Sequence, residues 1–164
     1  LTGVAHCINR CPVLGEAMLS IGIKGTESVV VTERNTASAM GSGTLPVFAT
    51  PAMIALIEST ASNSVAPFLD EGTSTVGTHL DIAHSSATPV GMEAICETEL
   101  VEIDRRRLVF KVAVRDAAGE IGSGTHERFV VNDDKFMSKA SAKLSQRSEK
   151  ACFEDKNRED EASA

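Results

Sequence analysis

The sequence contains no tryptophan and no tyrosine, and its six phenylalanines supply the whole aromatic content of 4%. The hydrophobic core must therefore consist mainly of aliphatic side chains. Proteins that bind single-stranded nucleic acid stack its bases on aromatic side chains. The shortage of aromatic residues argues against a ligand that is recognised in this way.

Positive charge is also scarce, because 16 Lys and Arg residues face 23 Asp and Glu residues, for a formal net charge of −7. Affinity for a phosphate backbone comes from clustered Lys and Arg, so we expect no nucleic-acid partner. No apolar run approaches the ~20 residues that cross a bilayer, and residues 1–17 lack the features of a secretion signal. We therefore expect no membrane partner and a cytoplasmic location.

Paired metal-ligand spacings are missing too. Of the four cysteines, Cys7 and Cys11 have no matching Cys or His pair downstream, and Cys96 and Cys152 stand alone. We interpret all four as free thiols in a reducing compartment. The sequence also lacks a G-x-S-x-G elbow, a P-loop and a dinucleotide fingerprint, so we expect neither a metal nor a cofactor.

A chain of 164 residues with 42% hydrophobic content is long enough for one packed domain. Regular patterning begins at Met18, so residues 1–17 are expected to be a poorly ordered extension and residues 18–144 the domain. Residues 145–164 are almost wholly polar and cannot bury enough surface to offset their ordering entropy. We predict a charged, disordered tail there.

Within the domain, the pattern predicts one strand, one long helix, four strands and a short closing helix. The helix is expected to run from Thr50 to about Val65 or Ala66, with Thr50 as N-cap, Pro51 at the first helical position and Pro67 as the stop. Its first two turns are apolar on every side, which is typical of a helix buried within a fold. The strands are predicted over residues 27–32, 75–84, 92–103, 107–115 and 120–131.

Short breaks separate the last three strands, which predicts an antiparallel meander. A buried helix followed by a long antiparallel meander is the element order of the hot-dog fold. The predicted fold class is therefore α+β, with an antiparallel sheet wrapped around a central helix.

Glu58 is the only Asp, Glu, Lys or Arg between Arg34 and Asp70, and it interrupts an apolar helix face. A carboxylate at this position is expected to be desolvated, which favours its protonated form unless a partner compensates. The alternative is a structural glutamate held by backbone donors, or one at the edge of the stripe that reaches water.

His84 ends the second predicted strand, where alternation places it on one face with Val76, Leu80 and Ile82. An imidazole at the mouth of an apolar layer can transfer a proton near neutral pH. A satisfied core histidine is the alternative. His126 is a competing candidate, and His79 on the outer face is a weaker one.

Thr50 lies at the positive end of the predicted helix, beside backbone N–H groups that can receive a developing oxyanion. A simple N-cap is the alternative interpretation. The basic run Arg105, Arg106 and Arg107 is compatible with binding phosphates, but we favour a solvated hairpin tip.

Residues 47–58, 76–92, 102–112 and 121–131 contain F-A-T, a glutamate eight residues after its threonine, G-T, and H-x-x-A-T-P-x-G. In this combination and order they resemble the fluoroacetyl-CoA thioesterase family of hot-dog proteins, over about residues 21–140. The resemblance implies that Thr50, Glu58 and His84 are catalytic, and that Gly77 lines the acyl pocket. Thr78 and Phe48, within the same motifs, are assigned to substrate binding on the same basis.

The resemblance also implies a homodimer or a tetramer of dimers, with active sites at the dimer interface. Members that select fluoroacetyl groups use phenylalanines ahead of F-A-T as a lid, whereas residues 35–47 contain no aromatic residue. We therefore expect hydrolysis of a short-chain acyl-CoA rather than fluoroacetyl selectivity. The alternatives are a non-catalytic acyl-CoA-binding module and a hot-dog hydroxyacyl-CoA dehydratase.

Overall fold

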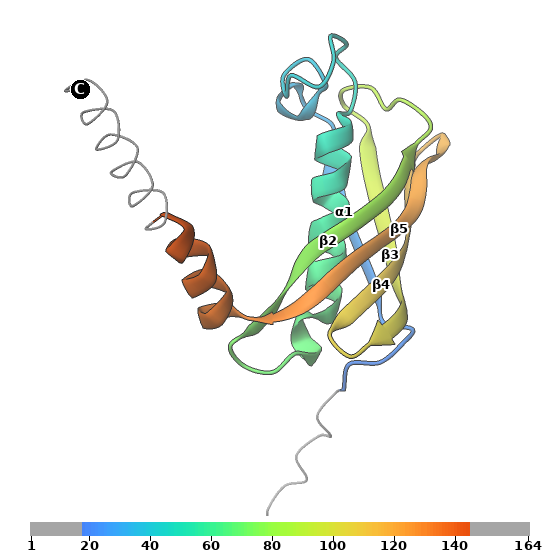
Figure 1. The fold of residues 1–164 in the computed structure, drawn as a ribbon. Helices are drawn as coiled ribbons and strands as arrows, with labels where there is room; N and C mark the ends of the chain where they lie inside the picture. The colour runs from blue at the N-terminus through green and yellow to red at the C-terminus, as the bar shows by residue number, and fades with distance from the viewer. Residues whose placement is uncertain (1–17, 145–164) are drawn as a thin grey trace, which may run out of the picture.

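The computed structural model describes residues 18–144, so the predicted extension 1–17 and tail 145–164 lie outside the described residues. One long helix and five strands form the body of the molecule (Figure 1). In chain order the elements are β1 (Lys24–Val30), η1 (Glu33–Asn35), α1 (Thr50–Val65), η2 (Ala66–Phe68), β2 (Thr73–His84), β3 (Glu93–Asp104), β4 (Arg107–Asp116) and β5 (Gly119–Asn132). A final helix spans residues 133–144.

The strands form one antiparallel sheet in the order β1-β3-β4-β5-β2, and this sheet curves around α1 (Figure 1). The predicted meander is confirmed, because β3 pairs with β4 and β4 pairs with β5. The predicted wrapping of the sheet around a central helix is confirmed as well. β1 and β2 lie at the two edges of the sheet.

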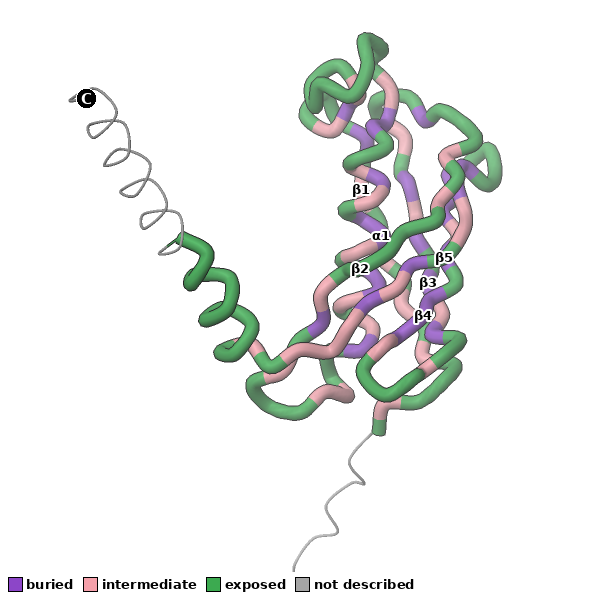
Figure 2. Tube along the Cα trace, in the orientation of Figure 1, coloured by how far each residue is buried: buried purple, intermediate pink, exposed green. Residues whose placement is uncertain are grey.

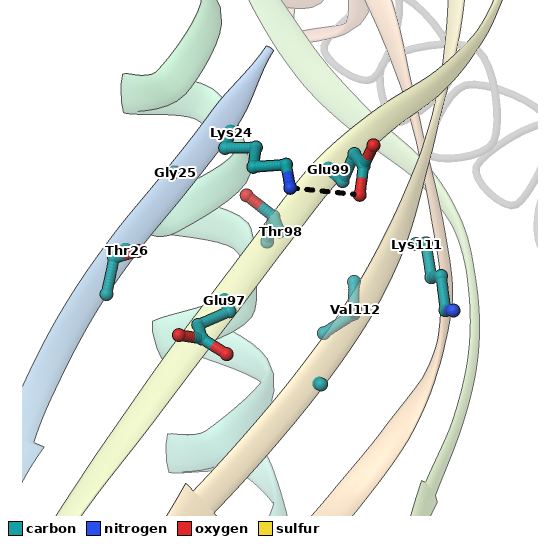
Figure 3. Close-up of a pocket in the computed structure, with 9 residues that line it drawn as sticks. Lys24, Gly25, Thr26, Glu97, Thr98, Glu99, Lys111 and Val112 are labelled. Carbon is teal, nitrogen blue, oxygen red and sulfur yellow. Dashed lines mark ion pairs between the residues drawn. The ribbon is translucent and has the colours of Figure 1, made fainter. Parts of the chain in front are cut away.

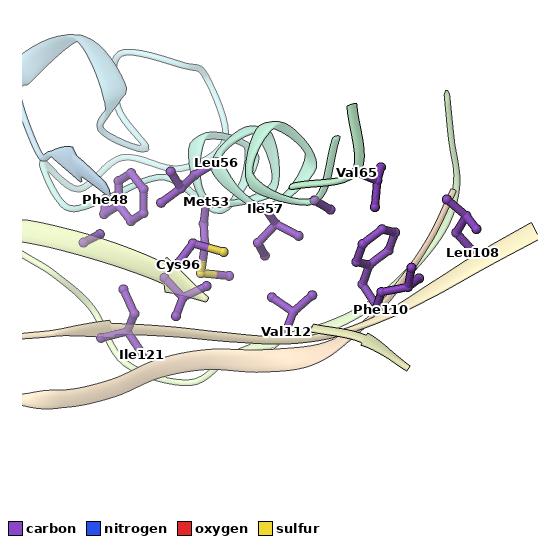
Figure 4. Packing of buried hydrophobic residues seen from close by; sticks show 14 of the residues in the cluster. Phe48, Met53, Leu56, Ile57, Val65, Cys96, Leu108, Phe110, Val112 and Ile121 are labelled. Carbon is purple, nitrogen blue, oxygen red and sulfur yellow. The ribbon is translucent and has the colours of Figure 1, made fainter. Parts of the chain in front are cut away.

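The core lies between one face of α1 and the concave face of the sheet, as Figures 2 and 4 show. Met53, Ile57 and Ala61 are fully buried at helical spacing, and each large aliphatic side chain buried in this way contributes ~1.5–3 kcal/mol. The expectation of a helix buried within the fold holds for one face of α1 only. Pro51 and Ala55 are exposed, because the sheet covers α1 from one side only.

The first strand begins at Lys24, three residues earlier than predicted, because Gly25 belongs to it. Glycine has a low strand propensity, so composition alone does not place it in a strand. Its role is close packing: a Cβ on Gly25 would lie 2.7 Å from the Cβ of Ser64. The bare backbone therefore allows β1 to approach α1 closely.

A β-bulge between Gly77 and His79 changes which residues of β2 face the helix. Gly77 pairs with the buried Arg128, and beyond the bulge His84 pairs with Gly122. Gly77 and His84 thus share the inner face although they are seven positions apart, a spacing that puts residues of a regular strand on opposite faces. The predicted placement of Val76 on the His84 face is wrong, because Val76 pairs with Phe129, next to Arg128 on β5.

Gly124 provides a test of how tightly β2 and β5 are joined. Its φ is +155°, and an added Cβ would collide with the backbone carbonyl of Asp81. We expect Gly124→Ala to lower the free energy of unfolding in urea by more than about 3 kcal/mol.

The matched control is Gly119→Ala, where φ is +144° but no atom lies within 4 Å of an added Cβ. This variant should lose only the ~1–3 kcal/mol of backbone strain. Equal losses in the two variants would contradict the proposed collision.

Candidate active site

Two of the predicted site residues meet at the upper end of the sheet. The Oγ1 atom of Thr50, the first residue of α1, lies 2.9 Å from Nδ1 of His84, the last residue of β2. The two residues are 34 positions apart in the sequence. Their hydrogen bond therefore depends on the fold that joins the helix start to the strand end.

The predicted N-cap role of Thr50 is wrong. Ala49 is the N-cap residue, with the extended φ of −76° and ψ of 139°, and no side chain caps the helix. The Thr50 hydroxyl is therefore used for the contact with His84. Met53 N–H makes the first intrahelical hydrogen bond, to Ala49, so the N–H groups of Thr50 and Ala52 precede it and remain available as donors.

The two ring nitrogens of His84 differ, because only Nδ1 has a hydrogen-bond partner among the described residues. Its Nε2 atom is buried and has no hydrogen-bond partner among the described residues. The protein itself therefore leaves this nitrogen open to a ligand or to water.

A cavity of about 240 Å³ opens beside the Thr50–His84 pair. Its other walls come from the loop that precedes α1 and the loop that follows β2, including Ala37, Ser42, Val47, Phe48, Ser85, Ser86 and Ala87. Phe48 is almost fully buried, with 1% of its surface exposed, and it also lines a second, larger cavity of about 480 Å³ along β1 and α1. Phe48 therefore separates the two cavities.

Glu58 lies away from this pair. Glu58 is eight positions after Thr50 in the same helix, which corresponds to ~12 Å along the helix axis. Its side chain is 42% exposed, so the predicted desolvation is wrong for a single chain, and the alternative position at the edge of the apolar stripe is correct. An added Cβ on Gly77 would collide with Glu58 Oε1, which shows that the carboxylate lies directly over Gly77.

Arg128 is the cation nearest to Glu58, with Nη1 3.9 Å from Oε1, and its side chain is only 7% exposed. Its Nε atom donates to Thr75 Oγ1 at 2.8 Å, and Nη2 donates to the Thr75 carbonyl at 2.7 Å. Nη1 also donates to the Glu58 carbonyl at 3.3 Å. Burial lowers the pKa of the Arg128 guanidinium, and the Glu58 carboxylate opposes this change. These acceptors hold a buried cation beneath the carboxylate.

His126 completes this second cluster as a neutral ring. Burial is the main cause that lowers its pKa. Its Nδ1 lies 3.0 Å from the His79 carbonyl, which can only accept, so Nδ1 holds the proton. Nε2 is then an acceptor and receives the Arg128 Nη1 donor at 3.2 Å. The 4.0 Å approach of Nε2 to Glu58 is therefore not an ion pair, and Arg128 is the cation that acts on this carboxylate.

A separate hollow of about 270 Å³ lies over β1, β3 and β4 (Figure 3). Its rim has mixed charge, with Lys24 paired to Glu99 at 3.7 Å, and an exposed pair of this kind contributes little. None of the predicted site residues lines it. The hollow therefore has no part in the candidate site.

The basic run behaves as the favoured interpretation predicts. Arg105 and Arg106 form the tip of the β3–β4 hairpin, and Arg107 is paired with Glu102 and Glu127. Among residues 18–144, no group of three His, Cys, Asp or Glu side chains is arranged to hold a metal ion. In the same part of the chain, no helix has both the length and the apolar character needed to span a bilayer.

The sequence of this chain matches a known protein family. The model of the family described as fluoroacetyl-CoA-specific thioesterase matches residues 31–134, more than half of the chain. The fluoroacetyl-CoA thioesterase of Streptantibioticus cattleyicolor is 40% identical over 97 residues, which cover 59% of this chain and 70% of that protein. The chain belongs to the fluoroacetyl-CoA-specific thioesterase family.

Solved structures agree with this membership. The structure of the fluoroacetyl-CoA thioesterase FlK superimposes with a TM-score of 0.72 at 34% identity, over 76% of this chain and 97% of that one. A hot-dog-like protein from Thermanaerovibrio acidaminovorans gives a TM-score of 0.69 at 18% identity, over 75% and 91% of the two chains, and supports the fold alone. The family resemblance and the fold predicted from the sequence are confirmed, and the protein is an enzyme of the thioester hydrolase class.

Within this thioesterase, the structure brings Thr50 and His84 together and places Glu58 in a different cluster. Gly77 lies under Glu58, whereas Thr78 is the exposed bulge residue, which donates to the Glu127 carbonyl. Sequence reasoning missed Arg128. The available signal was the alternation of β5, which places Arg128 on the same face as His126.

Gly77→Ala tests the second cluster. The added methyl group must displace the Glu58 carboxylate, which is the far end of a flexible side chain, so the fold should survive. We expect thioester hydrolysis to fall by at least about 10-fold, because a carboxylate moved by ~1 Å loses its alignment.

The matched control is Val76→Ala, on the same strand but across from Phe129, which should retain near-native hydrolysis. Melting temperatures of both variants should remain close to that of the parent. Native hydrolysis by Gly77→Ala would show that the position of the Glu58 carboxylate is unimportant.

Proposed function

We propose that this protein hydrolyses a short-chain acyl-CoA thioester to the free acid and coenzyme A. The single observation that supports this most strongly is the 2.9 Å contact of Thr50 with His84 at the start of α1. It places a hydroxyl, an imidazole and free backbone donors beside one cavity. Acyl transfer needs these three components.

The thioester carbonyl is proposed to lie at the N-terminus of α1. There the N–H groups of Thr50 and Ala52 and the helix dipole stabilise the negative charge that develops on its oxygen. Glu58 either attacks the carbonyl carbon, forming an anhydride that water then hydrolyses to the free acid, or removes a proton from the water that attacks the carbonyl. When the C–S bond breaks, the thiolate takes a proton from the His84 ring, the water that is consumed replaces this proton, and Thr50 orients the ring. These groups supply each proton transfer, so we propose that no metal or cofactor is needed.

One chain cannot bring all three residues to the same carbonyl, because ~12 Å of rigid helix separates Thr50 from Glu58. We propose that a second copy of the chain completes each site. Glu58 of one copy would then act with Thr50 and His84 of the other. The catalytic unit is a homodimer, alone or within a tetramer of dimers.

The edge strand β2 supports this arrangement. When two copies of one strand pair antiparallel, the numbers of facing residues add up to a constant. Facing residues must point to the same side of the sheet, so the two-fold axis passes through Asp81, which then faces its own copy. The bulge at Thr78 adds one residue and sets Gly77 of one copy level with His84 of the other. Paired strands lie ~4.8 Å apart, and Glu58 lies over Gly77, so the carboxylate reaches the neighbouring imidazole.

The acyl group is proposed to be short and not specifically fluorinated. The loop between β1 and α1 contains no aromatic residue before Phe48, and Phe48 itself is buried between the two cavities. We propose a cytoplasmic location, with which the free thiol of Cys96 is compatible. Burial raises the pKa of this thiol to about 11, which keeps it unreactive.

Glu58→Gln tests the chemistry. We expect release of thiol from a panel of acyl-CoA substrates, followed with a thiol reagent, to fall at least about 100-fold, because the amide cannot accept the proton. The exposed Glu99→Gln, at the β1–β3 edge, is the control and should hydrolyse the panel at the parental rate. An active Glu58→Gln variant would refute the assignment. Water loss from a hydroxyacyl-CoA without thiol release would instead identify a dehydratase.

Mixed dimers test the sharing of residues between copies. Glu58→Gln and His84→Asn are each expected to be inactive alone. Unfolding and refolding them together should restore about one quarter of the parental rate, because half of the dimers are mixed and each has one intact site. Absence of any recovery, with mixed dimers demonstrated by mass spectrometry, would show that Glu58 and His84 do not meet across an interface.

A further inference from the structure

Thr88 is a fully buried polar residue in the loop that follows His84. Its exposed fraction is 0%, and its hydroxyl donates to Asp116 Oδ2 at 2.8 Å. Asp116 ends β4 and is itself only 7% exposed. A buried hydroxyl-to-carboxylate hydrogen bond is stronger than a neutral one and fixes the geometry of both partners.

Asp116 is a rigid acceptor because its second oxygen is also used. Oδ1 accepts the Ala118 N–H at 2.8 Å within the β4–β5 turn. The Thr88 hydroxyl is the main cause that holds the pKa of Asp116 below its usual value, followed by the Ala118 N–H. Burial acts in the opposite direction and is outweighed. The turn therefore presents a fixed anion to the loop.

Thr88 also holds the segment that leads into α1. Its carbonyl accepts the Phe48 N–H at 2.8 Å, and Val47 forms an isolated antiparallel bridge with Pro89. Thr50 follows Phe48 by two residues, and His84 precedes Thr88 by four. Thr88 is thus linked to His84 through a short stretch of backbone and to Thr50 through its hydrogen bond with Phe48.

The end of β2 is hydrogen-bonded to the start of β5, just after the β4–β5 turn. The Ser85 N–H donates to the Ile121 carbonyl at 2.9 Å, so β2 leaves the sheet beside the residues that follow Asp116. The helix start, the strand end and the β4–β5 turn therefore meet at Thr88. The loop has no other buried side-chain hydrogen bond between residues 85 and 91 among the described residues.

We propose that Thr88 and Asp116 are positioning residues, which set the distance between the Thr50 hydroxyl and the His84 imidazole. This inference rests on the proposed catalytic role of that pair. Neither residue lines the cavity beside the pair, so each acts through the backbone that it anchors. A displacement of ~1 Å in a catalytic pair is enough to lower the rate about 100-fold.

Thr88→Val tests the proposal, because valine has the shape of threonine without the hydroxyl. We expect kcat for acyl-CoA hydrolysis to fall about 10-fold to 100-fold with little change in KM, since the pair and not the binding cavity is disturbed. Thr88→Ser, which keeps the hydroxyl, should restore most of kcat. A substitution that only destabilised the fold would not lower kcat at an unchanged KM and would not be rescued by serine.

The matched control is Thr98→Val. Thr98 is also a buried threonine, with 3% exposed, but its Oγ1 has no hydrogen-bond partner among the described residues and it lies in β3. This variant should retain the parental kcat. If Thr88→Val does not fold, Asp116→Leu provides the same test, because a leucine side chain of similar shape accepts neither hydrogen bond.

A second measurement is independent of hydrolysis. The ring ¹⁵N shifts of His84, assigned by comparison with His84→Asn, should change in Thr88→Val toward those of Thr50→Val and remain unchanged in Thr98→Val. Unchanged His84 shifts in Thr88→Val would overturn the positioning role, whatever the rate. If the parent hydrolyses no thioester but the His84 shifts still change in Thr88→Val, the positioning role is supported and the proposed function is refuted.

Discussion

The packing of α1 against the concave sheet determines where every functional group of this protein lies. Met53, Ile57 and Ala61 fix the rotation of the helix about its axis, because these are the side chains that the sheet buries completely. Once that rotation is set, Thr50 must meet the end of β2 and Glu58 must lie over Gly77. The site is therefore a consequence of core packing, not of a locally folded motif.

Much of this arrangement was predictable from the sequence, and the failures have identifiable causes. The helix and the meander were predicted because long periodic segments report burial directly. The role of the Thr50 hydroxyl was misread, because a cap and a tertiary contact look the same in a sequence. The face of Val76 was misread because a bulge shifts the alternation, and the T-V-G-T segment gives no sign of it.

Arg128 shows a different limit. An arginine beside His126 and Glu127 suggests a solvated strand, and only the structure reveals that its donors are occupied by Thr75, His126 and the Glu58 carbonyl. A buried cation is stable where enough acceptors compensate for lost hydration. The acceptors come from three separate elements, so no local pattern could have announced them. Patterns of hydrophobicity locate the core well and locate buried polar networks poorly.

The two edges of the sheet differ in a way that bears on how the site is completed. β1 has seven residues and includes Lys24 and Glu27, and short charged edges resist pairing with another chain. β2 has twelve residues with neither lysine nor proline, and most of its middle is exposed. The exposed helix residues Ala55 and Ser59 lie toward β1, where Ser59 donates to Glu27, whereas Glu58 and Ser62 are the helix residues beside β2. A long edge strand without lysine or proline suits close approach by an identical copy. The same edge lies beside the Glu58 carboxylate, so a second copy paired along β2 would bring this proposed acid toward the Thr50–His84 pair.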